Sequence, residues 1–280
     1  MFFYLRERLR LYNTSMNSLA IIIPARLEST RFPQKMLHPL LEKPLILWTA
    51  EGASKSKLAS KVIVATDSEA VYGIVRDAGF HAEMTQPYHR SGMERVGEVA
   101  CRHNYRWIIN LQGDEPLVTG RVLDILAKEA FESEEAGEPL EMATLVRDLD
   151  REDARDPNRV KVVTNLKDEA LYFSRSPIPY VRYPSGLPDG SYQAPRFLLH
   201  VGIYLYRRDI LEKLVTMEPT PLEKTEGLEQ LRALESGVRI RCIWTKEDFM
   251  GVDTLADVPR VEAALRSRLM SSESSDDSPK

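Results

Sequence analysis

Basic and hydroxyl side chains follow the first strongly apolar run of the chain, residues 19–23. They are Arg26, Ser29, Thr30, Arg31 and Lys35. An isoleucine-rich run of this length is typical of a strand that is buried on both faces. In an open α/β sheet, ligands bind at the carboxyl ends of the strands. A buried strand that ends in a cationic loop indicates a site for an anion, and our working hypothesis is a triphosphate.

Two carboxylates further along the chain have the setting of metal ligands. Asp114 follows the apolar run 107–111 and a glycine, and Asp253 follows Gly251 between a predicted strand and a predicted helix. Mg²⁺ takes carboxylate oxygens and completes its shell with waters and substrate phosphates. Taken singly, each residue has an ordinary explanation as a turn aspartate or a helix cap. Together with the cationic loop, they favour a metal-bridged nucleotide site.

The common nucleotide-binding motifs are absent from the sequence. The chain has no G-x-x-x-x-G-K-[ST] segment, and no G-x-G-x-x-G segment follows the first strand. The ATPase and dehydrogenase interpretations therefore lose their usual support. Phosphate would be held by side-chain cations, with arginine as a two-pronged donor and lysine as a point charge.

Strands and helices alternate four times in the first half of the chain. Strands are predicted over 19–23, 61–66, 81–85 and 107–111, and helices over 44–50, 69–78, 93–103 and 119–131. This alternation predicts the α/β class with a doubly wound, mostly parallel sheet. From residue 141 the pattern changes to strands at 142–146, 159–164, 170–173 and 198–206 without full helices between them. These strands predict an inserted β-rich lobe.

The C-terminal part returns to mixed structure. We expect helices over 209–216 and 225–236, a strand over 238–244 and a last helix that ends near residue 269. The predicted domain spans 19–268, with the inserted lobe at about 145–206 as a sugar-binding or dimer lobe. Residues 1–18 form an N-terminal extension, either disordered or an artefact of the start site. Residues 269–280 are predicted to be a disordered tail.

Composition excludes several classes of protein. The chain has 280 residues and a net charge of −4, which gives no basic excess for nucleic-acid binding. No segment approaches the length of a membrane-spanning helix. Two cysteines are too few for a disulfide framework or a zinc site, and they fit a cytoplasmic location.

Other polar residues are candidates through position alone. His200 and Tyr204 lie four residues apart on a predicted strand and would share a face. Arg175 follows a strand end, and Glu229 and Gln230 lie on a predicted helix. Each also has an ordinary explanation as a satisfied or solvated polar side chain.

Nine segments taken together resemble one family, the CMP-Kdo synthetases, also called 3-deoxy-manno-octulosonate cytidylyltransferases. The segments are IPARLESTRFPQK (23–35), ATDSE (65–69), MTQPYHRSGMERVGEVA (84–100), NLQGDEPLV (110–118), DPNRVKVV (156–163), ALYFSRSPIPY (170–180), FLLHVGIYLYRRDIL (197–211), PLEKTEGLEQLRALESG (221–237) and GVDTLADV (251–258). They occur in the order of the family and cover nearly all of residues 19–265.

The resemblance implies a reaction and a set of ligands. The anomeric 2-hydroxyl of the acid sugar Kdo attacks the α-phosphorus of CTP, and CMP-Kdo and pyrophosphate are the products. In the family, CMP-Kdo is used for lipopolysaccharide synthesis. The resemblance further implies Mg²⁺ as the cofactor and a homodimer. Nucleotidyl transfer depends mainly on positioning and on neutralising charge, which suits the cations and carboxylates found above.

The resemblance also assigns roles to residues. Arg26, Lys35, Asp114 and Asp253 would be catalytic, and both aspartates would bind the metal. The implied CTP site consists of Ala25, Arg26, Ser29, Arg31, Lys35, Ser91, Gly92 and Asp114. The implied Kdo site consists of Gln112, Arg175, His200, Tyr204, Glu229 and Gln230. Arg175 would pair with the sugar carboxylate.

Two positions depart from the family pattern. Met93 follows Ser91-Gly92, where family members usually have threonine or serine, which implies one hydroxyl fewer near the cytosine. Gln34 stands beside Lys35, where the family usually has glycine, which implies a stiffer or reshaped phosphate loop.

Three alternatives remain open at this point. The nearest is the same reaction on another acid sugar, such as 8-amino-Kdo or a nonulosonic acid. A non-catalytic nucleotide-binding protein is an alternative of another class, and the intact cations and carboxylates argue against it. A dehydrogenase would require tight NAD binding.

Overall fold

The computed structural model describes residues 18–27, 32–183 and 196–276, with side chains as far as residue 271. The chain divides into two compact units. The first contains Met1–Phe131 and Glu247–Lys280, and the second contains Glu132–Lys246. The second unit includes the whole of the predicted lobe, 145–206, and extends beyond it on both sides. The predicted N-terminal extension lies outside the described residues up to residue 17.

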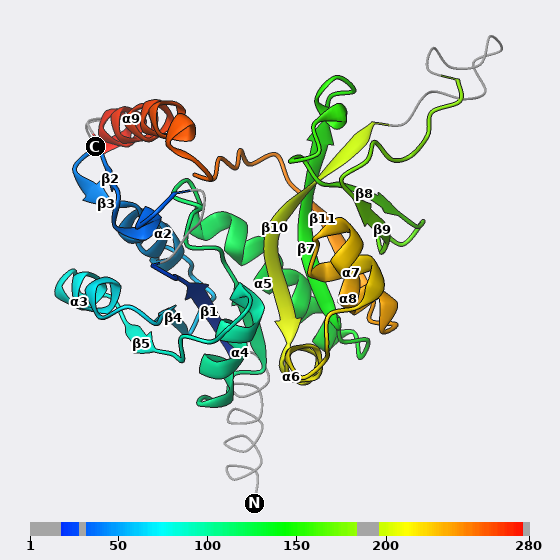
Figure 1. The fold of residues 1–280 in the computed structure, drawn as a ribbon, viewed down its shortest axis with the longest axis horizontal. Coiled ribbons are helices and arrows are strands. Elements are labelled where there is room, and N and C mark those ends of the chain that lie inside the picture. Colours follow the sequence, from blue (N-terminus) through cyan, green and yellow to red (C-terminus); the bar gives the residue numbers. More distant parts are fainter. Residues whose placement is uncertain (1–17, 28–31, 184–195, 277–280) are drawn as a thin grey trace, which may run out of the picture. The chain divides into compact units, whose positions relative to one another are not determined.

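A parallel sheet forms the core of the first unit (Figure 1). Its strands are β1 (Leu19–Pro24), β4 (Lys61–Thr66), β5 (Ala82–Met84) and β6 (Trp107–Asn110). Their order in the sheet is β6-β1-β4-β5, and neighbouring strands run parallel. Every residue of β1 is buried, as expected for an apolar strand with a strand on each side.

Helices connect these strands. They are α2 (Leu45–Ser54), α3 (Glu69–Asp77) and α4 (Gly92–Cys101), and α5 (Gly120–Glu135) follows β6. The chain moves from β1 to β4 and β5, then returns past β1 to form β6. Because such crossovers are right-handed, this reversal places the connecting helices on opposite faces of the sheet. The carboxyl ends of β1 and β6 meet where the strand order reverses, and ligands bind at that place in this class of fold.

Short elements complete the first unit. The 3-10 turn η1 (Lys35–Leu37) follows the cationic loop and precedes a small hairpin of β2 (Pro39–Leu40) and β3 (Lys43–Pro44). Near the C-terminus, the 3-10 turn η3 (Leu255–Asp257) leads into α9 (Val258–Asp276). The segment predicted to be a disordered tail is therefore helical as far as Asp276. A helix already started extends through polar residues at little cost.

The second unit is built around antiparallel strands (Figure 1). They are β7 (Met142–Leu149), β8 (Lys161–Thr164), β9 (Ala170–Ser174), β10 (Phe197–Arg207) and β11 (Ile240–Trp244). Strand β10 is antiparallel to β7 and β8, β9 is antiparallel to β8, and β11 is parallel to β7. The remaining elements are η2 (Asp153–Arg155), α6 (Arg208–Val215), α7 (Pro221–Glu226) and α8 (Gln230–Glu235). The predicted α/β class, with a mostly parallel sheet and a β-rich insertion, is confirmed.

One helix predicted from the sequence is wrong, because the structure has two helices in its place. The segment 225–236 was expected to be continuous, but it holds the end of α7 and all of α8. Gly227 ends α7 with a φ of 63°, a left-handed conformation that glycine adopts without strain. Thr220 and Glu223 start α7 with a capping box.

Helices α2 and α5 approach closely at two glycines in the first unit. A Cβ on Gly120 would lie 2.1 Å from the carbonyl carbon of Lys55, and one on Gly52 would lie 2.4 Å from the carbonyl oxygen of Val118. Main chain therefore packs against main chain at this seam. Over the part of the chain that the structure describes, no helix combines the length and apolar character needed to cross a membrane.

Candidate functional site

The first unit brings the cationic loop and the carboxylate of Asp114 together. The Lys35 Nζ donates to Asp114 Oδ2 at 2.5 Å, and the two side chains are 8% and 27% exposed. They are 79 residues apart in sequence and meet because β1 and β6 are neighbours in the sheet. This pair lies beyond the carboxyl ends of the two strands, where the sequence predicted a phosphate site.

Two glycines set the spacing of this site. A Cβ on Gly113 would lie 2.9 Å from Met36 Sδ and 3.0 Å from the carbonyl oxygen of Pro24. A Cβ on Gly92 would lie 3.2 Å from Pro24 Cγ and 3.3 Å from Gln112 Oε1. The loop after β6 and the start of α4 therefore pack closely against Pro24 at the end of β1, and neither glycine position has room for a side chain unless its neighbours move.

The segment that carries Asp253 joins the same place. The Val252 N–H donates to the carbonyl oxygen of Asp114 at 3.0 Å. A Cβ on Gly251 would lie 3.2 Å from Glu115 Oε1. Asp253 itself is exposed, and its N–H donates to Asp257 Oδ2 at 3.1 Å. The loop after β6, which carries Asp114, and the loop before η3, which carries Asp253, are thus joined by a main-chain hydrogen bond within the first unit.

Glu115 is a third carboxyl group here that sequence reasoning missed. Burial, and next the charges of Asp114 and Asp253, raise the pKa of Glu115 to about 8. Its Oε2 is buried and has no hydrogen-bond partner in the described structure. Position next to Asp114 was a visible signal, but the depth of the side chain depends on the Gly251 loop, which comes from far along the chain.

These residues fit a magnesium ion. Within the described ranges, no group of three or more His, Cys, Asp or Glu side chains has the arrangement of a metal site. Mg²⁺ needs fewer, because it commonly takes one or two carboxylates from the protein and the remaining ligands from substrate phosphates and water. The buried Glu115 Oε2 beside Asp114, which has no hydrogen-bond partner in the described structure, is a further oxygen of the kind that Mg²⁺ takes.

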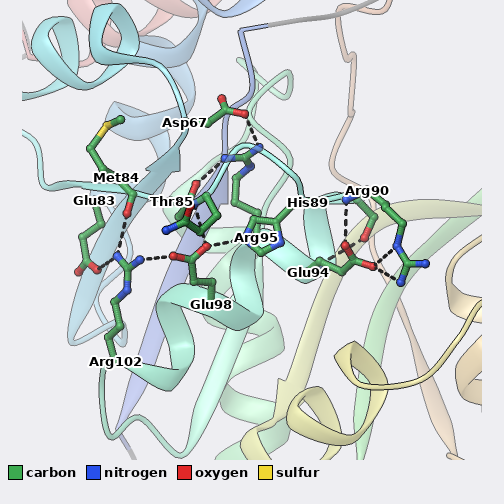
Figure 2. A network of polar contacts seen from close by, with 12 residues as sticks. Asp67, Glu83, Met84, Thr85, His89, Arg90, Glu94, Arg95, Glu98 and Arg102 are labelled. Atoms are coloured by element: carbon green, nitrogen blue, oxygen red, sulfur yellow. Dashed lines mark hydrogen bonds and ion pairs between the residues drawn. The ribbon is translucent and has the colours of Figure 1, made fainter.

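The loop that precedes α4 is tied to the side chains of that helix (Figure 2). Glu98 accepts from the Gln86 N–H at 3.0 Å and from the His89 ring, and Glu94 accepts from the Arg90 N–H at 2.9 Å. Burial alone would raise the pKa of Glu98, but the hydrogen bonds from His89 and Gln86 hold it below its ordinary value. We call residues 85–91 with these contacts the α4 clamp.

Buried arginine completes the α4 clamp (Figure 2). Arg95 donates to Asp67 Oδ2 at 2.7 Å and to Thr85 Oγ1, so the loop start is tied to the end of β4. Ser91 caps α4, because its Oγ accepts from the Glu94 N–H at 3.3 Å. Met93 is 2% exposed and belongs to the core. Its side chain therefore occupies a core position, where a hydroxyl group would also be buried.

Gln34 keeps a glycine-like backbone. Its φ of 55° and ψ of 26° lie in the left-handed region, immediately before η1. The loop shape is therefore one that glycine adopts easily and glutamine adopts at a cost of about 1 kcal/mol.

The remaining residues of the implied CTP site are less informative. Ala25 is buried, and its N–H donates to the carbonyl oxygen of Ala65 at 2.8 Å. Arg26 is exposed. Ser29 and Arg31 lie outside the described residues. Gln112 donates through Nε2 to Asn110 Oδ1 at 3.2 Å and lies beside Gly92.

In the second unit, Arg175 is held by main-chain oxygens. Its Nε donates to the carbonyl of Glu226 at 2.7 Å, one terminal nitrogen to that of Pro157 at 3.0 Å, and the other to that of Gly227 at 3.3 Å. A guanidinium carries five N–H groups, so two remain for a ligand. The split between α7 and α8 at Gly227 supplies two of these carbonyl groups.

Aromatic rings surround His200 on β10. The His200 ring centroid lies 5.3 Å from that of Tyr204 and 5.0 Å from that of Phe173. The predicted shared face of His200 and Tyr204 is therefore present. Burial lowers the pKa of His200 to about 3 and raises the pKa of Tyr204 well above its usual range, so both groups are neutral at ordinary pH.

Among the residues implied for the sugar, two buried nitrogens lack hydrogen-bond partners within the described residues. They are His200 Nε2 and Gln230 Nε2. Gln230 is 5% exposed at the start of α8, next to Glu229. Burying an unpaired polar atom is costly, so such atoms commonly point to a missing ligand or water. Of the residues implied for the sugar, Arg175, His200, Tyr204, Glu229 and Gln230 lie in the second unit and Gln112 lies in the first.

Known proteins match this chain along most of its length. A family model for cytidylyltransferases matches residues 20–240. A 3-deoxy-manno-octulosonate cytidylyltransferase of Chlorobaculum parvum is 43% identical over 254 residues, which cover 90% of this chain and 98% of that protein. One from Bdellovibrio bacteriovorus is 44% identical over 256 residues, with 89% and 98% covered.

A solved structure agrees with these relatives. A CMP:2-keto-3-deoxy-manno-octonic acid synthetase in complex with CTP superposes with a TM-score of 0.81 at 37% identity and covers 90% of this chain and 99% of its own. The fold, the paired cation and carboxylate at the carboxyl ends of β1 and β6, and the matches in sequence lead to one conclusion. The chain belongs to the 3-deoxy-manno-octulosonate cytidylyltransferase family of cytidylyltransferases.

Proposed function

We propose that this protein transfers CMP from CTP to the anomeric hydroxyl of Kdo and releases pyrophosphate. The observation that carries the proposal is the meeting of Lys35, Asp114 and the Asp253 segment at the carboxyl ends of β1 and β6. A cation and carboxylates at such a place suit a metal-bridged nucleoside triphosphate. Membership of the family supports CTP as the nucleotide and Kdo as the acceptor.

The first unit holds the nucleotide in this proposal. Lys35 and Arg26 bind triphosphate oxygens, helped by Ser29 and Arg31, and Ala25 lies beside them. Ser91 and Gly92, at the end of the α4 clamp, present main-chain groups to cytosine. Because pyrimidine recognition then depends on backbone position, the clamp contacts of Glu94 and Glu98 support it.

Asp114 and Asp253 would hold Mg²⁺. When bound, the ion supplies charge neutralisation at the phosphates and acidifies the attacking hydroxyl group. In the absence of ligands, Asp114 is paired with Lys35 at 2.5 Å. Nucleotide binding would exchange that pair for a Lys35–phosphate contact and free the Asp114 carboxylate.

The second unit supplies the residues that hold the sugar acid in this proposal. Arg175 has two unused N–H groups for the carboxylate, and His200 and Gln230 have unpartnered nitrogens for hydroxyl groups. Tyr204 and Glu229 complete the set in this unit. His200 acts as a neutral group, because burial keeps its pKa near 3. The sugar oxygen forms a bond to the α-phosphorus. The bond between that phosphorus and the oxygen that bridges the α- and β-phosphates breaks, so pyrophosphate leaves. The hydroxyl proton passes to solvent.

We further propose a cytoplasmic homodimer that serves lipopolysaccharide synthesis. Exposed apolar side chains of the second unit support an interface there: Leu166 is 105% exposed, Leu171 61% and Tyr180 90%. Such residues are costly to leave in water. Light scattering should give twice the 31.9 kDa chain mass, and Leu171→Asp should shift the mass toward that of one chain. A monomer without any substitution would contradict the dimer.

A pyrophosphate-release assay tests the function. CTP is offered with Kdo, with 8-amino-Kdo and with a nonulosonic acid, with Mg²⁺ and with EDTA. We expect release with CTP and Kdo that requires the ion. Turnover with another acid sugar but none with Kdo would contradict the acceptor, and nucleotide binding without any turnover would support a non-catalytic role.

A further inference from the structure

A buried lysine in the second unit has no assigned role in the reaction described above. Lys161 lies on β8 and is 0% exposed. Its Nζ donates to the carbonyl oxygen of Asp156 at 2.9 Å and to that of Arg175 at 2.5 Å. Within the described residues, no carboxylate lies at ion-pair distance from this nitrogen. Buried lysines are rare and are normally paired with an acid, so this one requires an explanation.

The lysine is joined to Arg175 through the main chain of that residue. Lys161 holds the Arg175 carbonyl, and Glu226 Oε2 accepts from the Arg175 N–H at 2.9 Å. The guanidinium group is held by the carbonyls of Pro157, Glu226 and Gly227. Arg175 is therefore fixed at its N–H, its carbonyl and its side chain, and it loses little freedom when it binds a ligand.

Both cations are solvated by neutral oxygens. The carboxylates of Asp156 and Glu226 act on Lys161 through their charge, and the Glu226 oxygens accept from Ser174 Oγ at 2.7 Å and from the Arg175 N–H. In the part of the chain that the structure covers, no ion pair involves the guanidinium of Arg175. Carbonyl groups satisfy the N–H donors but do not cancel the charge, and the nearby carboxylates of Asp156 and Glu226 oppose it without forming an ion pair with either cation.

The protonation of the lysine is consistent with this arrangement. Burial lowers the pKa of Lys161, the charge of Asp156 acts in the opposite direction, and the charge of Arg175 adds to the lowering. An anion bound by Arg175 would relieve the repulsion between the two cations. The two groups therefore gain most when a single negative charge is bound close to both.

We propose that Lys161 is a positioning residue for the carboxylate of the acid sugar. It fixes the main chain of Arg175 and, from behind that residue, adds a buried positive charge that favours an acid over an uncharged analogue. The inference rests on the proposed function, because it names a further determinant of the same sugar site. A lysine that only caps two carbonyl groups would give no preference for a charged ligand.

Two variants and two ligands separate these roles. Lys161→Gln keeps an amide donor for the carbonyl groups and removes the charge. Lys161→Arg keeps the charge. The ligands are Kdo and its 1-carboxamide, which has the same shape and no charge, and both are measured by calorimetry and by competition in the pyrophosphate assay. KM for CTP reports on the first unit and serves as an internal control.

We expect Lys161→Gln to raise the KM and the dissociation constant for Kdo about tenfold, as loss of one nearby charge would do. Binding of the carboxamide and the KM for CTP should change less than about twofold. Lys161→Arg should recover most of the affinity for Kdo. Equal losses for acid and carboxamide would overturn the proposal and leave Lys161 a structural residue.

A second variant, with the opposite expected effect on Kdo binding, tests the proposal if Lys161→Gln does not fold. Glu226→Gln removes a negative charge beside Arg175 and retains an acceptor for its N–H. We expect tighter binding of Kdo by about twofold to threefold and unchanged binding of the carboxamide. Unchanged or weaker binding of Kdo relative to the carboxamide would contradict the inference. If the unsubstituted protein neither binds nor converts Kdo, the proposed function itself fails.

Discussion

Lys35 in the first unit and Arg175 in the second are cations satisfied in opposite ways. Lys35 forms an ion pair with Asp114 at 2.5 Å, while Arg175 is held by three main-chain carbonyl groups. In the proposed function a Lys35–phosphate contact would replace the first arrangement, whereas the second leaves N–H donors and charge for a ligand. Nucleotide binding should therefore reorganise its site, and sugar binding should meet a preformed one.

The difference also concerns the carboxylates. Asp114, Glu115 and the Asp253 segment gather carboxyl groups in the first unit, where burial, and next the charges of Asp114 and Asp253, raise the pKa of Glu115 to about 8. In the second unit, hydrogen bonds from Ser174 and the Arg175 N–H outweigh burial and lower the pKa of Glu226. The carboxyl groups of the first unit suit the proposed cation, and the guanidinium of the second, which has no ion pair within the described residues, suits an anion.

Removing the charge of Asp114 should have the largest effect. Asp114→Asn leaves Lys35 without its partner and weakens the hold on Mg²⁺, so turnover should fall by about a hundredfold or more. Manganese binding followed by electron paramagnetic resonance should weaken in parallel.

Asp124→Asn is the matched control for that variant. Asp124 accepts from Ser56 Oγ at 2.6 Å and from the Lys57 N–H at 3.1 Å, away from the site. Its loss should lower stability with near-normal turnover. Turnover of Asp114→Asn close to that of the control would disprove the metal assignment.

The second-largest effect should come from a substitution of Arg175 in the preformed site. Arg175→Lys removes the fork that spans three carbonyl groups, so KM for Kdo should rise about tenfold to a hundredfold while KM for CTP changes little. Steady-state kinetics with each substrate varied would measure this. Arg159→Lys is the control, because Arg159 forms a half-exposed pair with Asp153 at 2.7 Å. Equal rises in both KM values would show that the two sites are not separable in this way.

The α4 clamp gives the corresponding test for the nucleotide. Glu98→Ala removes the contacts with the Gln86 N–H and with His89 (Figure 2), so KM for CTP should rise about tenfold and selectivity against UTP should fall. Arg102→Ala, on the 40% exposed side of the same network, should change KM less than about twofold. A selectivity unchanged by Glu98→Ala would separate the clamp from base recognition.

A smaller effect should appear in the pH dependence of the free energy of unfolding. The folded-state pKa of Glu115 lies above its ordinary value, near 8, so its contribution is complete below about pH 4.5 and is lost as the pH rises through 8. Glu115→Gln should therefore gain stability over the unsubstituted protein by on the order of 1–3 kcal/mol between pH 5 and pH 9. Urea unfolding in EDTA at these two pH values measures the difference. Parallel curves for the two proteins would contradict the raised pKa.

The smallest expected effect is at Gln34. Gln34→Gly relieves a left-handed glutamine, so the free energy of unfolding should rise by about 0.5–1 kcal/mol, and Tm by about 2–3 °C. Glu42→Gly, at a φ of 68° in the β2–β3 hairpin, is the control with the same backbone and no phosphate nearby. A lower Tm for Gln34→Gly would show that the side chain makes a contact worth more than the strain.

Much of the first unit could be predicted from the sequence, for a physical reason. Buried parallel strands are continuous apolar runs, and their carboxyl ends share one edge, so Lys35 and Asp114 could be placed together before any coordinates. The nine segments added the family. Glu115 could not be found in this way, because its burial is created by Gly251, more than a hundred residues later.

The second unit was less predictable. The break at Gly227 depends on a single left-handed residue inside a helical pattern, and it creates the carbonyl groups that hold Arg175. Lys161 looked like an ordinary strand lysine. Its side chain is buried where its Nζ meets the carbonyl oxygens of Asp156 and Arg175, which only the folded chain brings together.

The glycine seam between α2 and α5 has a consequence for how this sequence can change. At Gly120 and Gly52, a single added carbon would lie within 2.4 Å of main chain. Both atoms belong to the main chain, which cannot change rotamer to make room as a side chain could. In a saturation library these two positions should reject all nineteen alternatives as firmly as the site itself. A map of tolerance would therefore mark a second invariant region of the molecule that binds nothing.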